Sequence, residues 1–107
     1  MKAPRVYVTA DIGPEAIGRL SGAGFEVEVH PKVEPPDYEE LTAKVVSGID
    51  GLVTTIRDRI DDPLLEKAAA AGVKIVAQVA VGVDNIDVPA ATRHGIPVAN
   101  TPDVLSD

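Results

Sequence analysis

The sequence predicts an α/β domain built on a parallel sheet, because short β-like segments alternate with amphipathic helical segments along the chain. Two further observations support this. One β-like segment alternates strictly between apolar and polar residues, whereas another is almost continuously apolar, so they suit an edge and a central strand. With 107 residues, 45% of them hydrophobic, the chain can form one domain with a real core. A domain of this size buries roughly two thirds of its unfolded surface.

Five segments are expected to form strands: residues 5–9, 25–29, 51–55, 73–79 and 96–99. The segment 25–29 (F-E-V-E-V) is the strictly alternating one, so one of its faces should meet water at an edge of the sheet. The segment 73–79 is apolar except for Lys74 and Gln78, as expected for a buried central strand.

Four helices are expected between these strands, at about 14–23, 37–46, 62–71 and 87–94. Asp37 and Asp87 are candidate N-caps, and either Asp61 or Asp62 could cap the third helix ahead of Pro63. This alternation predicts a flavodoxin-like, five-stranded parallel sheet of order 2-1-3-4-5 with helices on both faces. After the fifth strand only T-P-D-V-L-S-D follows, so we expect the final covering helix to be missing.

Composition excludes several classes of function. The chain has no cysteine, which rules out disulfides and thiolate zinc sites, and His30 and His94 are far apart, so we expect no metal site. A net charge of −7 argues against binding to nucleic acid. No apolar run is long enough for a membrane span and no signal peptide is apparent, so a cytoplasmic location is expected.

The most informative segment is 79–101, V-A-V-G-V-D-N-I-D-V-P-A-A-T-R-H-G-I-P-V-A-N-T. Gly82 follows an apolar strand and precedes a capped helix, so successive backbone N–H groups here could form an anion-binding turn at the carboxyl edge of the sheet. Alternatively, Gly82 only permits a turn with positive φ. Asp84 and Asp87 could be mistaken for an acid/base pair, but Asp87 suits an N-cap better.

The chain resembles the N-terminal part of the D-isomer-specific 2-hydroxyacid dehydrogenases, closest to the glyoxylate/hydroxypyruvate reductase branch. The resemblance rests on G-F-E-V-E-V, D-R-I-D, A-V-G-V-D-N-I-D-V-P-A-A-T-R-H-G-I-P-V and N-T-P-D-V-L-S-D. It implies that residues 1–107 are a truncated substrate-binding (catalytic) domain and that the nucleotide-binding domain is absent.

The resemblance also implies site residues. Backbone N–H groups of Val81 and Gly82, next to Ala80, would bind the carboxylate of a small 2-oxoacid or 2-hydroxyacid. Arg57 matches an arginine of phosphoglycerate dehydrogenases that approaches the substrate's anionic end, whereas glyoxylate reductases more often have a small polar residue there. Arg57 could pair with a second carboxylate or a phosphate; alternatively, it is a solvated arginine beside Asp58 and Asp61.

The machinery for catalysis is not expected in this chain. No G-x-G-x-x-G is present, so this chain should bind no dinucleotide, although the full-length parent would use NAD(P). The family's catalytic Arg, Glu and His lie downstream of Asp107, so no catalytic residue is assigned and the chain alone should be inactive. His94 precedes Gly95 at the end of a helix, where a structural role through the helix dipole is expected.

Other functions are less well supported. A receiver-like phosphoacceptor would need an acidic pair after the first strand and an Asp ending the third, but the third ends in Thr54-Thr55. A flavin carrier would need a Ser/Thr-rich loop where A-D-I-G stands. A purely structural, self-associating module remains the alternative. Uncovered apolar surface near the first and fifth strands should favour a homodimer or a domain-swapped form.

Overall fold

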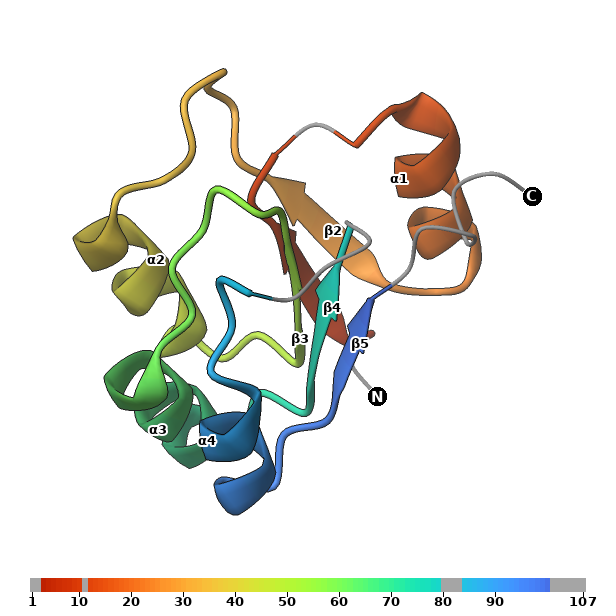
Figure 1. Ribbon diagram of the computed structural model, residues 1–107. Coiled ribbons are helices and arrows are strands. Elements are labelled where there is room, and N and C mark those ends of the chain that lie inside the picture. Colours follow the sequence, from red (N-terminus) through yellow and green to blue (C-terminus); the bar gives the residue numbers. More distant parts are fainter. Residues whose placement is uncertain (1–2, 11, 80–83, 101–107) are drawn as a thin grey trace.

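A computed structural model describes residues 3–10, 12–79 and 84–100 and contains one five-stranded sheet of order β2-β1-β3-β4-β5 (Figure 1). All four strand pairs are parallel. The strands are β1 (Arg5–Val8), β2 (Glu26–Val29), β3 (Gly51–Thr54), β4 (Ile75–Gln78) and β5 (Val98–Asn100). The predicted strand order is therefore confirmed, and the alternating strand β2 lies at an edge.

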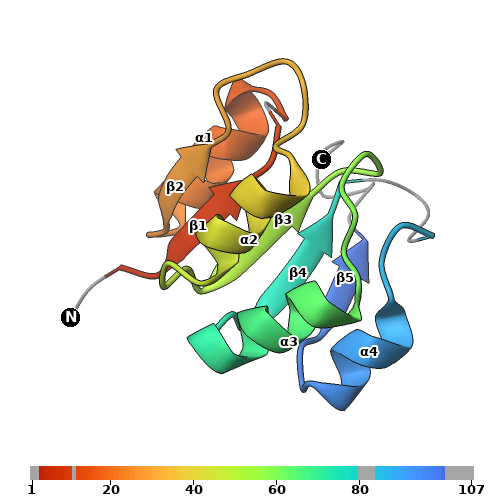
Figure 2. The ribbon, with the colours of Figure 1, turned by 90° about the vertical axis from the view of Figure 1, so that its left-hand side faces the viewer.

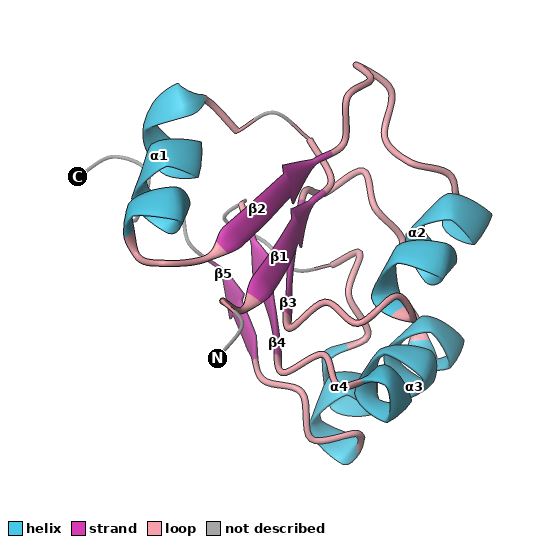
Figure 3. Cartoon of the chain, turned by 180° about the vertical axis from the view of Figure 1, so that it is seen from behind, coloured by secondary structure: helices cyan, strands magenta, loops and turns pink. Residues whose placement is uncertain are grey.

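The four predicted helices are also present, as α1 (Pro14–Gly22), α2 (Tyr38–Val45), α3 (Asp62–Ala71) and α4 (Val88–Arg93). Helix α1 covers one face of the sheet, and α2, α3 and α4 cover the other (Figures 2 and 3). Within the described residues, α1 is the one helix on its face. None of the helices in the described part is long and apolar enough to cross a membrane.

Aspartate side chains start three of the helices, each by accepting a hydrogen bond from a backbone N–H in the first turn. Asp37 accepts from Glu40 N at 2.8 Å, Asp61 from Leu64 N at 3.2 Å, and Asp87 from Ala90 N at 3.0 Å. The caps at Asp37 and Asp87 are confirmed, and Asp61 rather than Asp62 caps α3. The carboxylate of Asp62 is therefore available for a different contact.

The two faces of the sheet differ in how completely they are covered. The larger core lies under α2, α3 and α4, and its largest fully buried side chains include Tyr7, Leu41, Ile49, Leu52, Ile60, Leu64 and Leu65. The smaller core consists of buried Val6, Val8 and Val53, against which partly buried side chains of α1 pack. Within the described residues, the single helix on this face therefore leaves more of the sheet exposed to solvent than the three helices on the other face do.

The segment 73–79 contains the predicted central strand, but the strand is shorter than predicted and is not buried along its whole length. The strand begins at Ile75, whose side chain is 42% exposed, whereas Val76 is fully buried. Ile75 lies on the α1 face and lines an open apolar groove of about 310 Å³, together with Val6, Leu20, Phe25, Val53 and Ala77 among others. The expected apolar surface thus lies over β1, β3 and β4; no residue of β5 lines it.

The N-cap of α4 can be tested by substitution of Asp87. Replacing Asp87 with Ala should lower the free energy of unfolding by about 1 kcal/mol, because the N–H of Ala90 loses its acceptor. Urea denaturation of both proteins measures the difference. Asp87→Asn is the matched control, since asparagine also caps helices and should leave stability near that of the parent. An equal loss in both variants would contradict a capping role.

Candidate functional site

The loops that follow the parallel strands emerge at one edge of the sheet, where a ligand site is expected (Figure 1). The loop after β3 and the loop after β4 are joined there by a parallel bridge between Ile60 and Ile86. In this bridge, the N–H of Ile60 donates to the carbonyl of Asn85 at 3.1 Å, and the N–H of Asp87 donates to the carbonyl of Ile60 at 2.8 Å. The two loops therefore have a fixed register.

A reciprocal pair of side-chain amides, Gln78 and Asn85, closes the loop after β4. Gln78 Nε2 donates to Asn85 Oδ1 at 2.7 Å, and Asn85 Nδ2 donates to Gln78 Oε1 at 2.8 Å. Gln78 is the last residue of β4 and is fully buried. Asn85 Nδ2 also lies 2.7 Å from the carbonyl of Asp58 and 3.1 Å from that of Thr55. The amide pair thus joins the two residues that flank the segment 79–84, and Asn85 holds them to the loop after β3.

Asp58 connects the same region to the end of β1. Its carboxylate Oδ2 accepts hydrogen bonds from the hydroxyl of Thr9 and, at 2.9 Å, from the N–H of Thr55. Its side chain is only 3% exposed, and Oδ1 is buried with no hydrogen-bond partner among the described residues. Sequence reasoning treated Asp58 only as a surface neighbour of Arg57, which is wrong, because the chain turns this carboxylate inward.

Arg57 is exposed at the carboxyl edge, in the loop after β3. Neither expected neighbour holds its guanidinium. Asp58 is buried, and Asp61 caps α3, accepts from the hydroxyl of Tyr38 at 2.5 Å and forms an ion pair with Arg59 at 3.1 Å. Within the described part of the chain, Arg57 has no carboxylate partner. Its guanidinium is therefore free to meet an anion.

The other expected site residues, Ala80, Val81 and Gly82, lie outside the described residues. Their role in binding a carboxylate stays a prediction. The structure does describe the residues on either side of them, since Val79 N donates to the carbonyl of Thr54 at 2.8 Å and the amide pair closes the loop. Sequence reasoning missed this pair; a lone glutamine in an apolar strand was the one available signal.

His30 serves the fold rather than acid/base chemistry. It is 3% exposed, and its Nε2 donates to the carbonyl of Glu34 at 3.0 Å, while Nδ1 lies 3.3 Å from the hydroxyl of Tyr7. Burial, followed by the negative charges of nearby carboxylates, raises the pKa of Tyr7 to about 12, so this phenol stays neutral. These contacts anchor the loop after β2 to β1.

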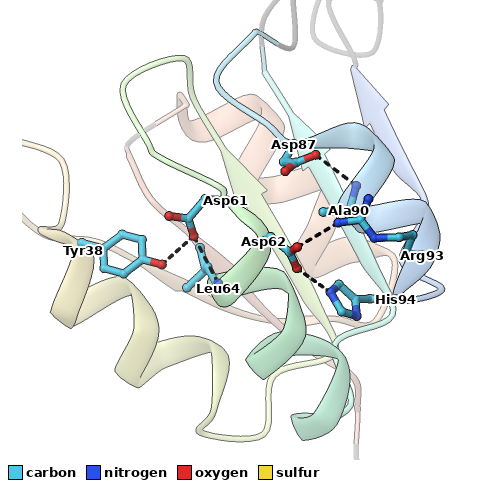
Figure 4. Close-up of polar contacts among 8 residues, drawn as sticks. All are labelled: Tyr38, Asp61, Asp62, Leu64, Asp87, Ala90, Arg93 and His94. Atoms are coloured by element: carbon cyan, nitrogen blue, oxygen red, sulfur yellow. Dashed lines mark hydrogen bonds and ion pairs between the residues drawn. The ribbon is translucent and has the colours of Figure 1, made fainter.

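His94 donates a hydrogen bond to the first turn of α3 (Figure 4). Its Nε2 lies 2.7 Å from Asp62 Oδ1, and Arg93 Nη2 lies 2.8 Å from Asp62 Oδ2. The hydrogen bond from His94 and then that from Arg93 hold the pKa of Asp62 below its usual value. The contact joins the end of α4 to the start of α3, which is a structural role.

The same contact brings three potential metal ligands together, namely Asp62, Glu66 and His94, whose ligand atoms lie within 4.8 Å of one another. The distance between the two histidines in sequence could not reveal this group, because it depends on the packing of α4 against α3. Both carboxylate oxygens of Asp62 are already engaged, one of them by the cationic Arg93. This charge arrangement suits an ion-pair network better than a metal ion.

Comparison with known proteins identifies the family of proteins to which this chain is similar. Residues 6–107 match the family model described as D-isomer specific 2-hydroxyacid dehydrogenase, catalytic domain. Glyoxylate reductase of Aeropyrum pernix is 51% identical over 107 residues, which cover 100% of this chain and 31% of that protein. Glyoxylate reductase of Thermococcus kodakarensis is 47% identical and is covered over 30% of its length.

Solved structures agree with this assignment. The protein TT0316 from Thermus thermophilus superposes with a TM-score of 0.81 at 42% identity, covering 94% of this chain and 31% of that one. An NAD⁺-bound 3-phosphoglycerate dehydrogenase from Entamoeba histolytica gives a TM-score of 0.73 at 25% identity, covering 92% and 33%. The chain belongs to the D-isomer specific 2-hydroxyacid dehydrogenase family, and it spans about a third of the length of these relatives.

The hydrogen bonds between Gln78 and Asn85 should contribute strongly to the stability of the loops at the carboxyl edge. Asn85→Ala should lower the free energy of unfolding by about 2–3 kcal/mol, because the buried Gln78 amide loses one of its partners and two loop carbonyls lose their donor. Chemical denaturation measures the loss. Asp84→Ala, at the exposed neighbouring position, should change stability by less than about 0.5 kcal/mol. Similar small effects in both variants would show that the pair does not hold the loops.

The pKa of Asp62 should depend more on His94 than on Arg93. His94→Asn should raise this pKa towards its ordinary value of 3.8 by more than Arg93→Gln does, as measured by NMR titration of the Asp62 carboxyl carbon. Because the folded-state pKa is depressed, the stabilisation is present above pH 3.8 and is lost as pH falls through the folded-state value. A larger change in the pKa of Asp62 in Arg93→Gln than in His94→Asn would contradict this prediction.

Proposed function

We propose that this chain is the substrate-binding part of an NAD(P)-dependent D-2-hydroxyacid dehydrogenase that acts on a small 2-oxoacid such as glyoxylate or hydroxypyruvate. The observation that carries the proposal is the amide pair, which fixes both ends of the segment 79–84 at the carboxyl edge. The identity of 51% to a glyoxylate reductase supports the choice of substrate class.

In this proposal the backbone N–H groups of Val81 and Gly82, beside Ala80, bind the substrate carboxylate. Glycine allows a ligand to approach the backbone closely, and successive N–H groups can converge on an anion. A loop that is closed at its base loses less conformational entropy when it binds. The clamped ends of the segment therefore favour a small ligand that makes few contacts.

Arg57 is proposed to face the outer side of the substrate at the same edge. Its exposed guanidinium has no carboxylate partner in the described part of the chain, so it can attract an anion to the edge. A positive charge there raises the rate at which the anionic substrate associates. The backbone N–H groups then fix the position of its carboxylate.

Hydride transfer would be supplied by NAD(P), whose chemistry belongs to the cofactor. The present sequence has no G-x-G-x-x-G loop, so it lacks the phosphate-binding residues that NAD(P) would need. No reaction step is therefore assigned to this chain, and we propose that the 107 residues alone do not turn over substrate. Their contribution is to bind and orient the 2-oxoacid.

A self-associating structural module is the second candidate. The apolar groove beside α1 and the 42% exposure of Ile75 favour it, because contiguous apolar surface promotes association. Such a homodimer or domain-swapped form needs no ligand at the carboxyl edge. Ligand titration therefore separates the two candidates.

The proposal is tested by two-dimensional amide NMR of this chain with increasing glyoxylate. We expect saturable shifts at residues 79–86, with few changes elsewhere. Gly82→Ala should weaken binding about tenfold, because a methyl group obstructs close approach to the backbone. Gly18→Ala is the matched control, since Gly18 lies in α1 with nothing within 4 Å of an added Cβ.

Dispersed spectra without any shift at millimolar glyoxylate would contradict the ligand role and favour the structural module. An equal effect of Gly82→Ala and Gly18→Ala would contradict the assignment of the carboxylate to the segment 80–83.

A further inference from the structure

Asp58 lies where the ends of three strands meet. Its carboxylate oxygen Oδ2 accepts a hydrogen bond from the hydroxyl of Thr9, the residue that follows β1. The same oxygen accepts a second hydrogen bond, at 2.9 Å, from the N–H of Thr55, the residue that follows β3. The backbone carbonyl of Asp58 lies 2.7 Å from Nδ2 of Asn85, in the loop after β4. This one residue therefore joins the ends of β1, β3 and β4.

The turn from Thr55 to Asp58 is closed by hydrogen bonds in both directions. The N–H of Asp58 donates to the carbonyl of Thr55 at 3.1 Å, while the carboxylate of Asp58 accepts from the N–H of Thr55. Thr9 attaches this turn to the sheet, because it is buried and its own N–H donates to the carbonyl of Val53 at 3.0 Å. The turn therefore has a defined orientation relative to both β1 and β3.

The orientation of this turn determines where the loop after β4 is held. The carbonyls of Thr55 and Asp58 lie 3.1 Å and 2.7 Å from the same amide nitrogen of Asn85. A rotation of the turn would move both acceptors away from this amide. The residues that flank the segment 79–84 would then lose their attachment to the loop after β3.

The second carboxylate oxygen of Asp58 indicates that this arrangement has a cost in stability. Oδ1 is buried without a hydrogen-bond partner, and none of the ion pairs among the described residues involves this carboxylate. A neutral side chain would avoid the cost of burying an unpaired carboxylate. Departures of this kind from the best local choice are expected at functional sites. The geometry that Oδ2 imposes therefore explains this residue better than stability does.

We propose that Asp58 is a positioning residue for the loop after β4. Its carboxylate orients the turn 55–58, and this turn places Asn85 and thereby the segment 79–84. For the substrate, this role rests on the proposed function, which assigns the substrate carboxylate to that segment. A carboxylate oxygen suits the role, because hydrogen bonds to a charged acceptor are stronger than those to a neutral one. A binding loop that is held in place beforehand loses less conformational entropy when its ligand binds.

Hydrogen exchange, measured by NMR on the chain without ligand, tests the positioning role. The N–H groups of Ile60 and Asp87 form hydrogen bonds between the loops after β3 and β4, whereas the N–H of the fully buried Val76 donates to the carbonyl of Pro97. In Asp58→Ala, exchange at Ile60 and Asp87 relative to exchange at Val76 should become about tenfold faster, because the two loops open locally. A loss of global stability alone would speed exchange at all three groups and would not raise this ratio.

Asp50→Ala is the matched control. Asp50 also accepts a hydrogen bond from the backbone of another strand, from the N–H of Arg5 at 2.8 Å, but it lies at the opposite edge of the sheet. This variant should leave the ratio within about twofold of the parent value, because its effect is not confined to the carboxyl edge.

Two milder variants complete the test. Asp58→Asn should keep the ratio within about threefold of the parent value, because an amide oxygen can accept the same two hydrogen bonds. Thr9→Val removes one of the two donors to Asp58 and keeps the shape of the side chain, so it should raise the ratio about threefold. It decides the question if Asp58→Ala does not fold.

An unchanged ratio in Thr9→Val and in any folded Asp58→Ala would overturn the proposal. An equal rise in Asp50→Ala and Asp58→Ala would overturn it as well. A rise in Asp58→Asn as large as that in Asp58→Ala would also do so, since the hydrogen bonds to Oδ2 would then not be what orients the turn.

Glyoxylate titration extends the test to the substrate. Asp58→Ala should weaken binding at residues 79 and 84–86 about fivefold, because only molecules that keep the binding arrangement contribute to the affinity. Asp50→Ala should change the affinity by less than about twofold, because it is remote from the loop. Unchanged affinity in Asp58→Ala would overturn the role towards the substrate. If the parent chain binds no glyoxylate, the proposed function fails, whereas the exchange ratios still decide whether Asp58 positions the loop.

Discussion

The reciprocal hydrogen bonds between the side-chain amides of Gln78 and Asn85 organise the carboxyl edge of this sheet. Gln78 ends β4 and is fully buried, so its amide must find partners inside the protein. Asn85 is one of these partners, and its side chain also lies within hydrogen-bond distance of the carbonyls of Thr55 and Asp58. One side chain therefore closes the loop after β4 and joins it to the loop after β3. The bridge between Ile60 and Ile86 extends this junction into the backbone.

The unequal cover of the two sheet faces accounts for much of the remaining structure. Three helices bury the larger core, and their mutual contacts include the hydrogen bond from His94 to Asp62. The opposite face is covered by α1 within the described residues and keeps an apolar groove next to Ile75. The loops that follow the strands emerge at the carboxyl edge of the sheet, between these two faces.

Local features were predicted well, because their causes are local. Asp37 and Asp87 cap helices through contacts within three residues, and Gly72 and Gly95 adopt positive φ at helix ends. The choice between Asp61 and Asp62 was not local. Both precede Pro63, and Asp62 is engaged by His94 and Arg93, which approach only when α4 packs on α3.

Long-range polar contacts were missed for the same reason. Asp58 is adjacent to Arg57 in sequence, but its carboxylate turns inward to Thr9, which is 49 residues away. The apolar run 73–79 indicated a central strand, yet a pattern of residues cannot say how fully each sheet face is covered. Ile75 is exposed because of that difference.

The sequence by itself determined the order of strands and helices, the family and most of the caps, since these follow from periodicity, turn residues and a long specific motif. Tertiary structure decided which polar groups meet, namely Gln78 with Asn85 and Asp58 with Thr9. The physical reason is that parallel strands bring residues from distant segments to one edge. Only packing determines which of those groups are buried, which are paired and which are left free for a ligand.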